Sequence, residues 1–205
     1  MKTLKLITLI GILLCSINLS AQEEYSINQE QQEEINRRFK LKLCEFQNLL
    51  ETLANKEYMN TVDCENGVTV NTGKKISSEE DARILIKNAV NRYFAYGDKS
   101  LIEVTNSKGE KTKRYISSYL QGLYQLPYKK VNIVFANTCM IDSIRRGVDG
   151  LFYGTIVVEQ RFTGKGELMY TDKEFKSFDV IVDVDPDEPN KIEVKIGDIL
   201  VAEQR

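Results

Sequence analysis

The chain contains no histidine among its 205 residues. Histidine is the usual general base at neutral pH and a common ligand of zinc. Its absence excludes Ser-His-Asp and Cys-His catalysis in their usual forms, together with zinc sites built on histidine. Any chemistry would depend on carboxylates, tyrosine, lysine or cysteine, and we expect no cofactor and no metal site.

Proline and excess charge are also scarce. Only three prolines occur, and the formal net charge is −2. A chain with few prolines and no low-complexity tract is typical of a folded, compact protein. A mildly acidic balance gives no reason to expect nucleic acid or an anionic membrane as a partner.

Residues 1–21 are predicted to form a secretory signal. Lys2 and Lys5 give a basic start, residues 6–15 form an apolar run, and Ala21 is a small residue at the expected cleavage point. The run is shorter than the roughly 20 residues that a bilayer requires. We therefore expect an exported protein, periplasmic or extracellular, with no stable membrane insertion after cleavage.

Two alternatives to this signal remain open. Residues 1–21 could serve as a short membrane anchor. They could also form a lipoprotein signal at Cys15, although Leu14 stands where such a signal requires a small residue.

Export would leave three cysteines, Cys44, Cys64 and Cys139. An oxidising compartment then allows at most one disulfide within the chain. Cys44 with Cys64 is the expected pair because it closes a modest loop, and three free thiols are the alternative. Cys139 is in phase with the apolar residues of a predicted strand, so it is expected to be a small buried side chain.

The hydrophobic pattern changes its period along the chain. A period near 3.6 predicts helices over 28–57, 77–97 and 116–124, and a hairpin is predicted over 101–114. Residues 60–76 are predicted to be a loop, with or without a small hairpin. From residue 129 the period is two, which predicts strands over 131–141, 151–162, 168–185 and 192–201.

Helices in the first half and strands in the second indicate an α+β fold. We expect three helices packed on the concave face of a strongly curved antiparallel sheet. The predicted organisation is a signal (1–21), a polar helical extension (22–35) and a single domain (36–205).

This element order resembles the NTF2-like family, also called the SnoaL-like or cystatin-like cone. Four stretches are similar to secreted NTF2-like proteins of the Bacteroidetes type: 115–128 (YISSYLQGLYQLPY), 130–135 (KVNIVF), 149–160 (DGLFYGTIVVEQ) and 194–199 (VKIGDI). The resemblance implies a conical pocket between helices and sheet. Some members are isomerases or dehydratases that use Asp, Tyr and often His, and others only bind ligands or partners. None of the family's catalytic positions can be matched here.

Tyrosines gather between the third predicted helix and the strands. We take Tyr115, Tyr119 and Tyr153 as candidate ligand-binding residues, with Asp142 as a candidate pocket carboxylate. The alternatives are core and rim packing for the tyrosines and a hydrated strand end for Asp142. The acidic stretch 183–188 is expected to be a solvated turn, because it lacks the glycine and the final glutamate of a calcium loop.

Two functions follow from these residues. The first is an exported, non-catalytic module that binds a small molecule, a glycan or a protein through its cone pocket or sheet face. The second is an isomerase or lyase that uses an Asp base and a Tyr in the pocket. The second requires a carboxylate within hydrogen-bonding reach of a tyrosine hydroxyl, deep in the cone. Charged residues on the outer sheet face predict a monomer or a weak homodimer.

Overall fold

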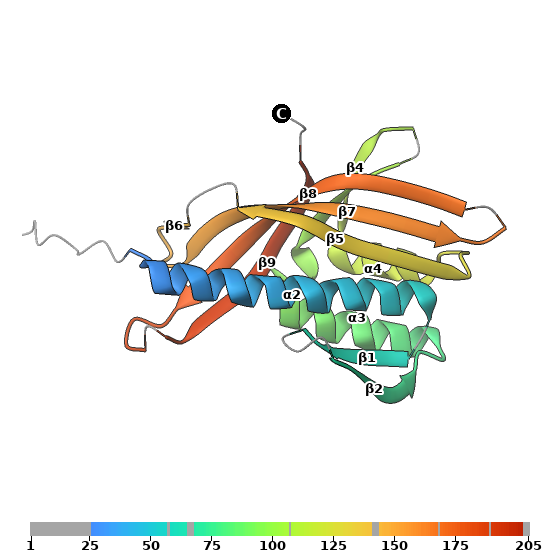
Figure 1. The fold of residues 1–205 in the computed structure, drawn as a ribbon, viewed down its shortest axis with the longest axis horizontal. Helices are drawn as coiled ribbons and strands as arrows, with labels where there is room; N and C mark the ends of the chain where they lie inside the picture. The colour runs from blue at the N-terminus through green and yellow to red at the C-terminus, as the bar shows by residue number, and fades with distance from the viewer. Residues whose placement is uncertain are drawn as a thin grey trace, which may run out of the picture.

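The computed structural model describes residues 26–56, 58–64, 68–106, 108–140, 144–167, 169–188 and 190–202. This part of the chain has an α+β fold, in which three helices pack on a curved seven-stranded sheet and a two-stranded hairpin lies beside them (Figure 1). The expected signal, 1–21, and Asp142 lie outside the described residues. Among those described, no helix is both long enough and apolar enough to cross a membrane.

The helices are α2 (Gln29–Asn55), α3 (Glu79–Tyr93) and α4 (Ile116–Tyr124), with a 3-10 turn at Gly97–Lys99. Asn28 and Gln31 form a reciprocal capping box at the start of α2. Residues 29–35, expected to belong to a polar extension, are the first turns of this helix, and Ile35 is fully buried. Ser77 followed by Glu80 fits the capping-box pattern and predicts a cap at Ser77, but Ser78 caps α3.

The seven-stranded sheet has the order β4-β3-β9-β8-β7-β5, with β6 paired to β7. Its strands are β3 (Leu101–Thr105), β4 (Lys111–Tyr115), β5 (Lys130–Met140), β6 (Arg145–Arg146), β7 (Phe152–Lys165), β8 (Met169–Val184) and β9 (Ile192–Val201).

The expectation of an antiparallel sheet is correct for every strand pair but one. Strands β3 and β9 are parallel, with Ile102 opposite Ile199, so the sheet is mixed. These two strands are joined by a long path through α4 and the central strands. Such a connection leaves their relative direction free, whereas short turns force the neighbours β7, β8 and β9 to be antiparallel.

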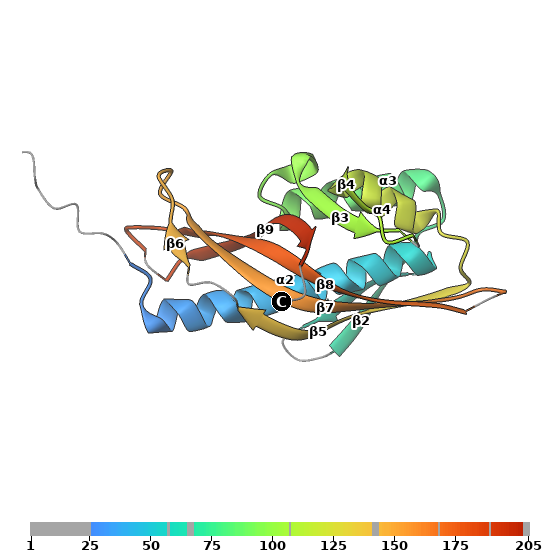
Figure 2. The same cartoon turned by 90° about the horizontal axis from the view of Figure 1, so that it is seen from above.

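A separate hairpin is formed by β1 (Tyr58–Asp63) and β2 (Val68–Lys75), where a loop or small hairpin was expected. It packs beside α2, and Figure 2 shows it on the side of α2 away from α4. A disulfide joins Cys44 of α2 to Cys64 at the end of β1, with their Cα atoms 6.0 Å apart. The hairpin is thus tied to the helix covalently.

The core lies between α2 and the inner face of the sheet. The Phe178 ring makes edge contacts with Phe39 and Phe135, at centroid distances of 6.1 and 5.7 Å. Phe46 stacks on Phe135 and meets Phe94 edge-on. These five rings join residues from α2, the end of α3, β5 and β8 into one aromatic cluster, which fixes the helices on the sheet.

One residue of the expected core is on the wrong face. The apolar periods predict a core of ten residues: Phe39, Phe46, Leu50, Ile86, Ala89, Tyr93, Val157, Val180, Val182 and Val194. On β7, Ile156 and Val158 are buried instead, and Val157 is only partly buried. Three consecutive apolar residues at 156–158 fit either phase of a strand, so the alternation there could not identify the inner face. Tyr93, also expected in the core, is packed at its margin.

The edge strand β5 is closed by side chains of α2. The backbone N–H groups of Val131, Ile133 and Phe135 donate to side-chain oxygens at 2.7, 2.8 and 2.9 Å. The acceptors are, in the same order, Asn55, Glu51 and Gln47 of α2. The acceptors are four residues apart on α2, a rise of about 6 Å. The donors are two residues apart on β5, a rise of about 6.7 Å, so each donor lies opposite an acceptor.

We predict that Asn55→Ala lowers the free energy of unfolding by about 1–3 kcal/mol. Asn55 accepts from the Val131 N–H and donates to the Val131 carbonyl at 2.8 Å, so its loss leaves both groups without these partners. Urea unfolding followed by circular dichroism measures the change. Lys40→Ala, on the exposed face of the same helix, is the control and should stay within about 0.5 kcal/mol of the wild type. Equal effects in both variants would contradict the role of Asn55.

Candidate functional site

The three candidate tyrosines lie in different surroundings. Tyr115 is 57% exposed at the start of α4, whereas Tyr119, one turn later, points into the interior. Tyr153 lies on β7, where its hydroxyl donates to Asp149 at 2.5 Å in an exposed turn. This bond raises the pKa of Tyr153 to about 12. This carboxylate–tyrosine pair is exposed, whereas the enzyme hypothesis requires such a pair deep in the cone.

The interior instead holds a polar cluster under α4. Lys176 of β8 is only 2% exposed, and its ammonium group donates to the Glu103 carbonyl at 2.5 Å and pairs with the Glu174 carboxylate. The other oxygen of Glu174 accepts from the Thr105 hydroxyl. Burial lowers the pKa of Lys176, and the neighbouring Glu174 partly offsets this.

Tyr119 completes this interior cluster. Burial raises the pKa of Tyr119 to about 12, and the side chain of Gln160 on β7 is hydrogen-bonded to its hydroxyl. Glu174 lies near enough to raise this pKa further. One oxygen of Glu174 pairs with Lys176 and the other accepts from Thr105, so both take part in contacts within the protein. The cluster therefore links β3 and β8 in the interior.

Gln160, Glu174 and Lys176 were not predicted as interior polar residues, although the alternation along the strands indicates them. The alternation that places Phe178 and Val180 inward on β8 also places Lys176 and Glu174 inward when it is continued backwards. Gln160 pairs directly with Glu174 across the β7–β8 ladder and faces the same side. Charged side chains are rarely buried in a core unless they are paired. The inward face of β8 was therefore predicted only for its apolar residues.

The outer face of the sheet carries a second buried charge. The Glu159 side chain, 3% exposed, is paired with Arg161 at 2.5 Å and Lys173 at 3.0 Å and accepts from Asn137 at 3.0 Å. Hydrogen bonds from Lys173 and then Arg161 lower the pKa of Glu159 from 4.5 to about 2. This carboxylate is fully partnered, so it supports the strand pair rather than a ligand.

We predict that Glu159→Gln reduces the loss of stability in acid. The folded pKa of Glu159 lies below its unfolded value, so its contribution is complete above about pH 4.5 and disappears as the pH falls towards 2. Urea unfolding at pH 6, 4 and 3 should therefore show a smaller change for the variant than for the wild type. Glu167→Gln, in an exposed turn, should follow the wild type. A variant that loses as much stability as the wild type between pH 6 and 3 would refute this role.

A groove lies between α3 and α4, with a volume of about 960 Å³. We call it the α3–α4 groove. It is lined by Glu80, Arg83, Ile84, Ile86, Lys87, Val90, Asn91, Asp98, Arg114, Ser117, Ser118, Gln121, Gly122 and Gln125. The groove lies in the helix layer, and not in the cone or on the sheet face where binding was expected. At Gly122 an added Cβ would meet nothing within 4 Å, so this wall is open.

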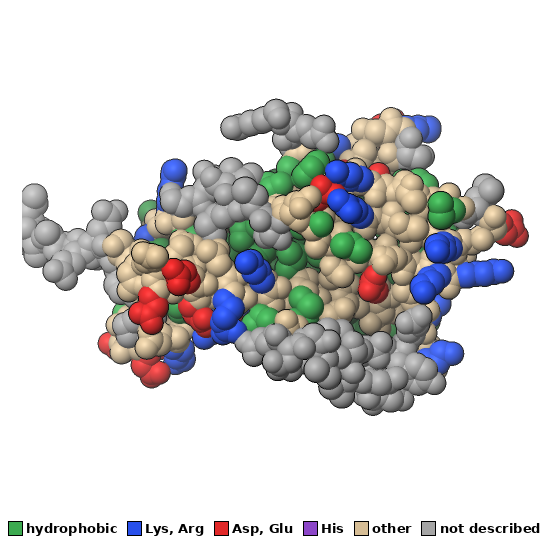
Figure 3. Space-filling view, in the orientation of Figure 1, with side chains coloured by type: hydrophobic (Ala, Val, Ile, Leu, Met, Phe, Trp, Pro, Cys, Tyr) green, Lys and Arg blue, Asp and Glu red, His purple; other side chains and the backbone are tan. Residues whose placement is uncertain are grey.

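Two smaller clefts lie along α2 and the start of β9. One, of about 440 Å³, is mostly acidic and is lined by Glu30, Gln31, Glu33, Glu34, Arg37, Asn190 and Ile192. Figure 3 shows Asp and Glu side chains gathered at this end of the molecule. The other, of about 370 Å³, is lined by three cations and two acids. Charge thus changes sign over a short distance along α2.

The fold and the site together describe an α+β protein with three helices on one curved sheet, the arrangement implied by the NTF2-like resemblance. No family model and no curated protein matches the sequence. Among solved structures, the 2.1 Å structure of ActVI-ORFA from Streptomyces coelicolor is similar, with a TM-score of 0.39 and 8% identity. The similarity covers 80% of this chain and 95% of that one.

Proposed function

We propose that this protein is an exported, non-catalytic binding module that holds a polypeptide segment in the α3–α4 groove. The observation that carries the proposal is the contrast between the interior and this groove. In the interior, Glu174, whose charge acts on the buried Tyr119, is engaged by Lys176 and Thr105. The groove is open and lined by polar groups that can exchange hydrogen bonds with a ligand.

The lining of the groove favours a polypeptide over a glycan or a small apolar molecule. Asn91, Gln121 and Gln125 carry amides that can both donate and accept, as a peptide backbone requires. The buried side chains of Ile86 and Val90 provide an apolar base. None of the fourteen residues that line the groove is aromatic, so it provides no ring on which a sugar could stack.

The charges of the groove favour a partner of mixed sign. Arg83 pairs with Glu80 at 3.4 Å, while Lys87, Arg114 and Asp98 add both signs along the walls. A polar rim around a small apolar base is the usual composition of a protein–protein contact.

Export remains part of the proposal. It rests on the basic start and apolar run of residues 1–21. The disulfide between Cys44 and Cys64 supports it, because such bonds persist mainly in oxidising compartments.

A cross-linking experiment tests the groove. Ser118, exposed on α4, is replaced by cysteine in a Cys139→Ser background and labelled with a photoactivatable cross-linker. With extract from the source cells, we expect a discrete protein adduct. Adding Gly122→Tyr, which fills the open wall, should abolish the adduct. Adding Asn88→Tyr, on the exposed face of α3 outside the groove, should preserve it.

Three results would overturn the proposal. The first is an undiminished level of adduct after Gly122→Tyr is added, and the second is the absence of a discrete adduct with the labelled protein itself. The third is a small molecule that co-purifies with the protein in native mass spectrometry and is retained by Gly122→Tyr. Such a ligand would place binding in the cone and revive the enzyme hypothesis.

A further inference from the structure

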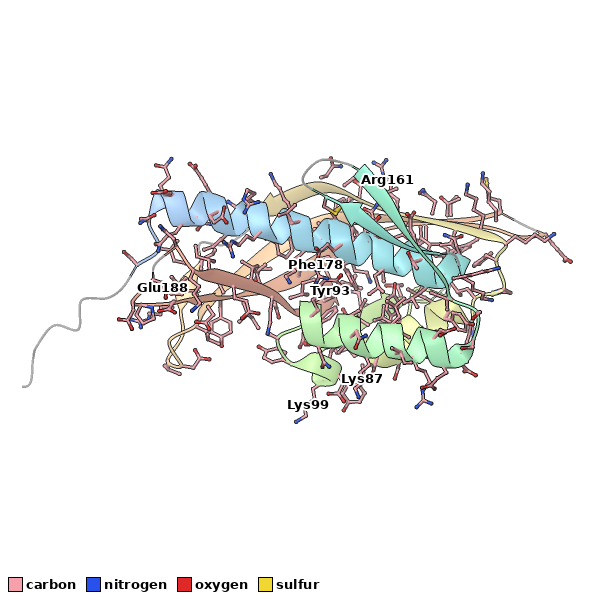
Figure 4. The ribbon with its side chains drawn as sticks, turned by 90° about the horizontal axis from the view of Figure 1, so that it is seen from below. Lys87, Tyr93, Lys99, Arg161, Phe178 and Glu188 are labelled. Carbon is pink, nitrogen blue, oxygen red and sulfur yellow. A yellow bond between two sulfur atoms is a disulfide. The ribbon has the colours of Figure 1, made fainter. Side chains whose placement is uncertain are left out.

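The smaller of the two clefts along α2 lies between this helix, the end of α3 and the start of β9. Its lining is Arg38, Leu41, Lys42, Glu45, Arg92, Ile192, Glu193 and Val194, and we call it the cationic cleft. Figure 4 shows Tyr93 at this end of α3, on the side that faces α2. We infer that the cationic cleft is a binding site for an oxyanion, a carboxylate or phosphate group, held by Lys42 together with Arg38 and Arg92.

Lys42 is the centre of the argument. Its ammonium group donates to the Arg92 carbonyl at 3.3 Å and lies 5.4 Å from the centre of the Tyr93 ring. Among the described residues it forms no ion pair with a carboxylate. Burial lowers the pKa of Lys42, the positive charges of Arg92 and Lys195 lower it further, and Glu45 and Glu193 act in the opposite direction. A half-buried cation without a counter-ion is energetically unfavourable.

The carboxylates around the cleft are already matched to other cations. Glu45 pairs with Arg92 at 3.0 Å, and Glu193 pairs with Lys195 at 3.2 Å. Glu34, next to the cleft, pairs with Arg38 at 2.6 Å and also with Arg37. Lys42 is the cation of this group that pairs with none of these carboxylates, and an oxyanion in the cleft would supply that partner.

The two arginines can contribute further donors. Arg38 uses one nitrogen on Glu34 and another on the Ile192 carbonyl, and Arg92 uses one on Glu45. Each guanidinium has five N–H groups in a fixed plane, so both keep donors for a second acceptor. The Arg92 guanidinium lies 5.5 Å from the Tyr93 ring, the same ring that Lys42 contacts. Both cations are thus held around one aromatic residue.

The remaining walls limit the size and nature of the ligand. Leu41, Ile192 and Val194 are apolar, and the cleft volume of about 370 Å³ lies at the small end of ligand pockets. The cleft therefore suits an oxyanion alone or one on a small organic body. It is separate from the α3–α4 groove, and the inference does not depend on the proposed function.

Nuclear magnetic resonance titration tests this site. Sodium phosphate and sodium acetate are added separately to the folded protein at an ionic strength held constant with sodium chloride, because screening alone shifts exposed charges. We expect saturable shifts of the backbone amides of Lys42, Arg92 and Glu193. The salt with the lower dissociation constant identifies phosphate or carboxylate as the preferred group.

Variants make the test specific. Lys42→Gln should weaken binding about tenfold or more, as expected for the loss of a hydrogen bond from a charged donor. Lys40→Gln, exposed on the same helix two residues away, should bind as the wild type does. If Lys42→Gln loses the spectrum of a folded protein, Arg92→Gln replaces it in the test and should also weaken binding of the anion. Absence of saturable shifts with both salts, or equal binding by Lys42→Gln and Lys40→Gln, would overturn the inference.

Discussion

Phe178→Ala should lower the free energy of unfolding by about 3–5 kcal/mol. Phe178 is fully buried, and its ring contacts Phe39 of α2 and Phe135 of β5. Its removal would leave a cavity at the centre of the aromatic cluster that fixes α2 on the sheet. These neighbours, on two different elements, can close such a cavity only if α2 or β5 moves, so little relaxation is expected.

Phe175→Ala is the matched control for this prediction. It removes the same ring from the same strand, but Phe175 lies on the outer face, partly exposed and covered by Lys173 at 5.4 Å. We expect a clearly smaller loss, which urea unfolding of both variants would measure. Similar losses at the two positions would mean that the assignment of the inner and outer faces of β8 is wrong.

Glu174→Ala and Lys176→Met should have unequal effects, although both break the same ion pair. Glu174→Ala leaves a buried ammonium group without its carboxylate, which costs about 3–5 kcal/mol. Lys176→Met fills the site with an apolar chain of similar length and leaves behind Glu174, which is the more exposed partner and keeps the Thr105 hydroxyl. The second change should therefore cost distinctly less.

The pH dependence distinguishes this explanation from a simple loss of packing. In Glu174→Ala the folded pKa of Lys176 stays below its unfolded value of 10.5, so the unfolded state binds more protons at alkaline pH. The deficit relative to the wild type should shrink as the pH rises from 7 towards 10. A deficit that is constant with pH, or an equal cost for Lys176→Met, would contradict the role given to the ion pair.

Most of the fold could be predicted from the period of the apolar residues. The last strand was predicted at 192–201, and β9 has these bounds. Helix α2 was predicted over 28–57 from the same repeat that buries Phe39, Phe46 and Leu50. Such patterns are reliable where one face is apolar and the other polar, because only one placement then buries the apolar side chains.

The contacts between distant segments could not be predicted in the same way. The parallel pairing of β3 with β9 depends on a single opposed pair, Ile102 and Ile199, that no local pattern specifies. The contacts of Lys42 likewise depend on how α2, α3 and β9 meet. Two of the tyrosines chosen from the sequence, Tyr115 and Tyr119, are neighbours in the chain, but helix α4 turns Tyr119 inward and leaves Tyr115 in solvent. Proximity in the chain was a poor guide to proximity in space.

The closed edge of β5 determines how copies of this protein could join by strand pairing. Gln47, Glu51 and Asn55 bond the N–H groups of Val131, Ile133 and Phe135, so this part of the β5 edge is not available to a new strand. At the opposite end of the sheet, two molecules that paired through β4 would form a two-fold pair. The exposed basic side chains of β4 oppose such pairing. Addition of a second sheet is therefore opposed by side-chain hydrogen bonds along part of β5 and by charge along β4.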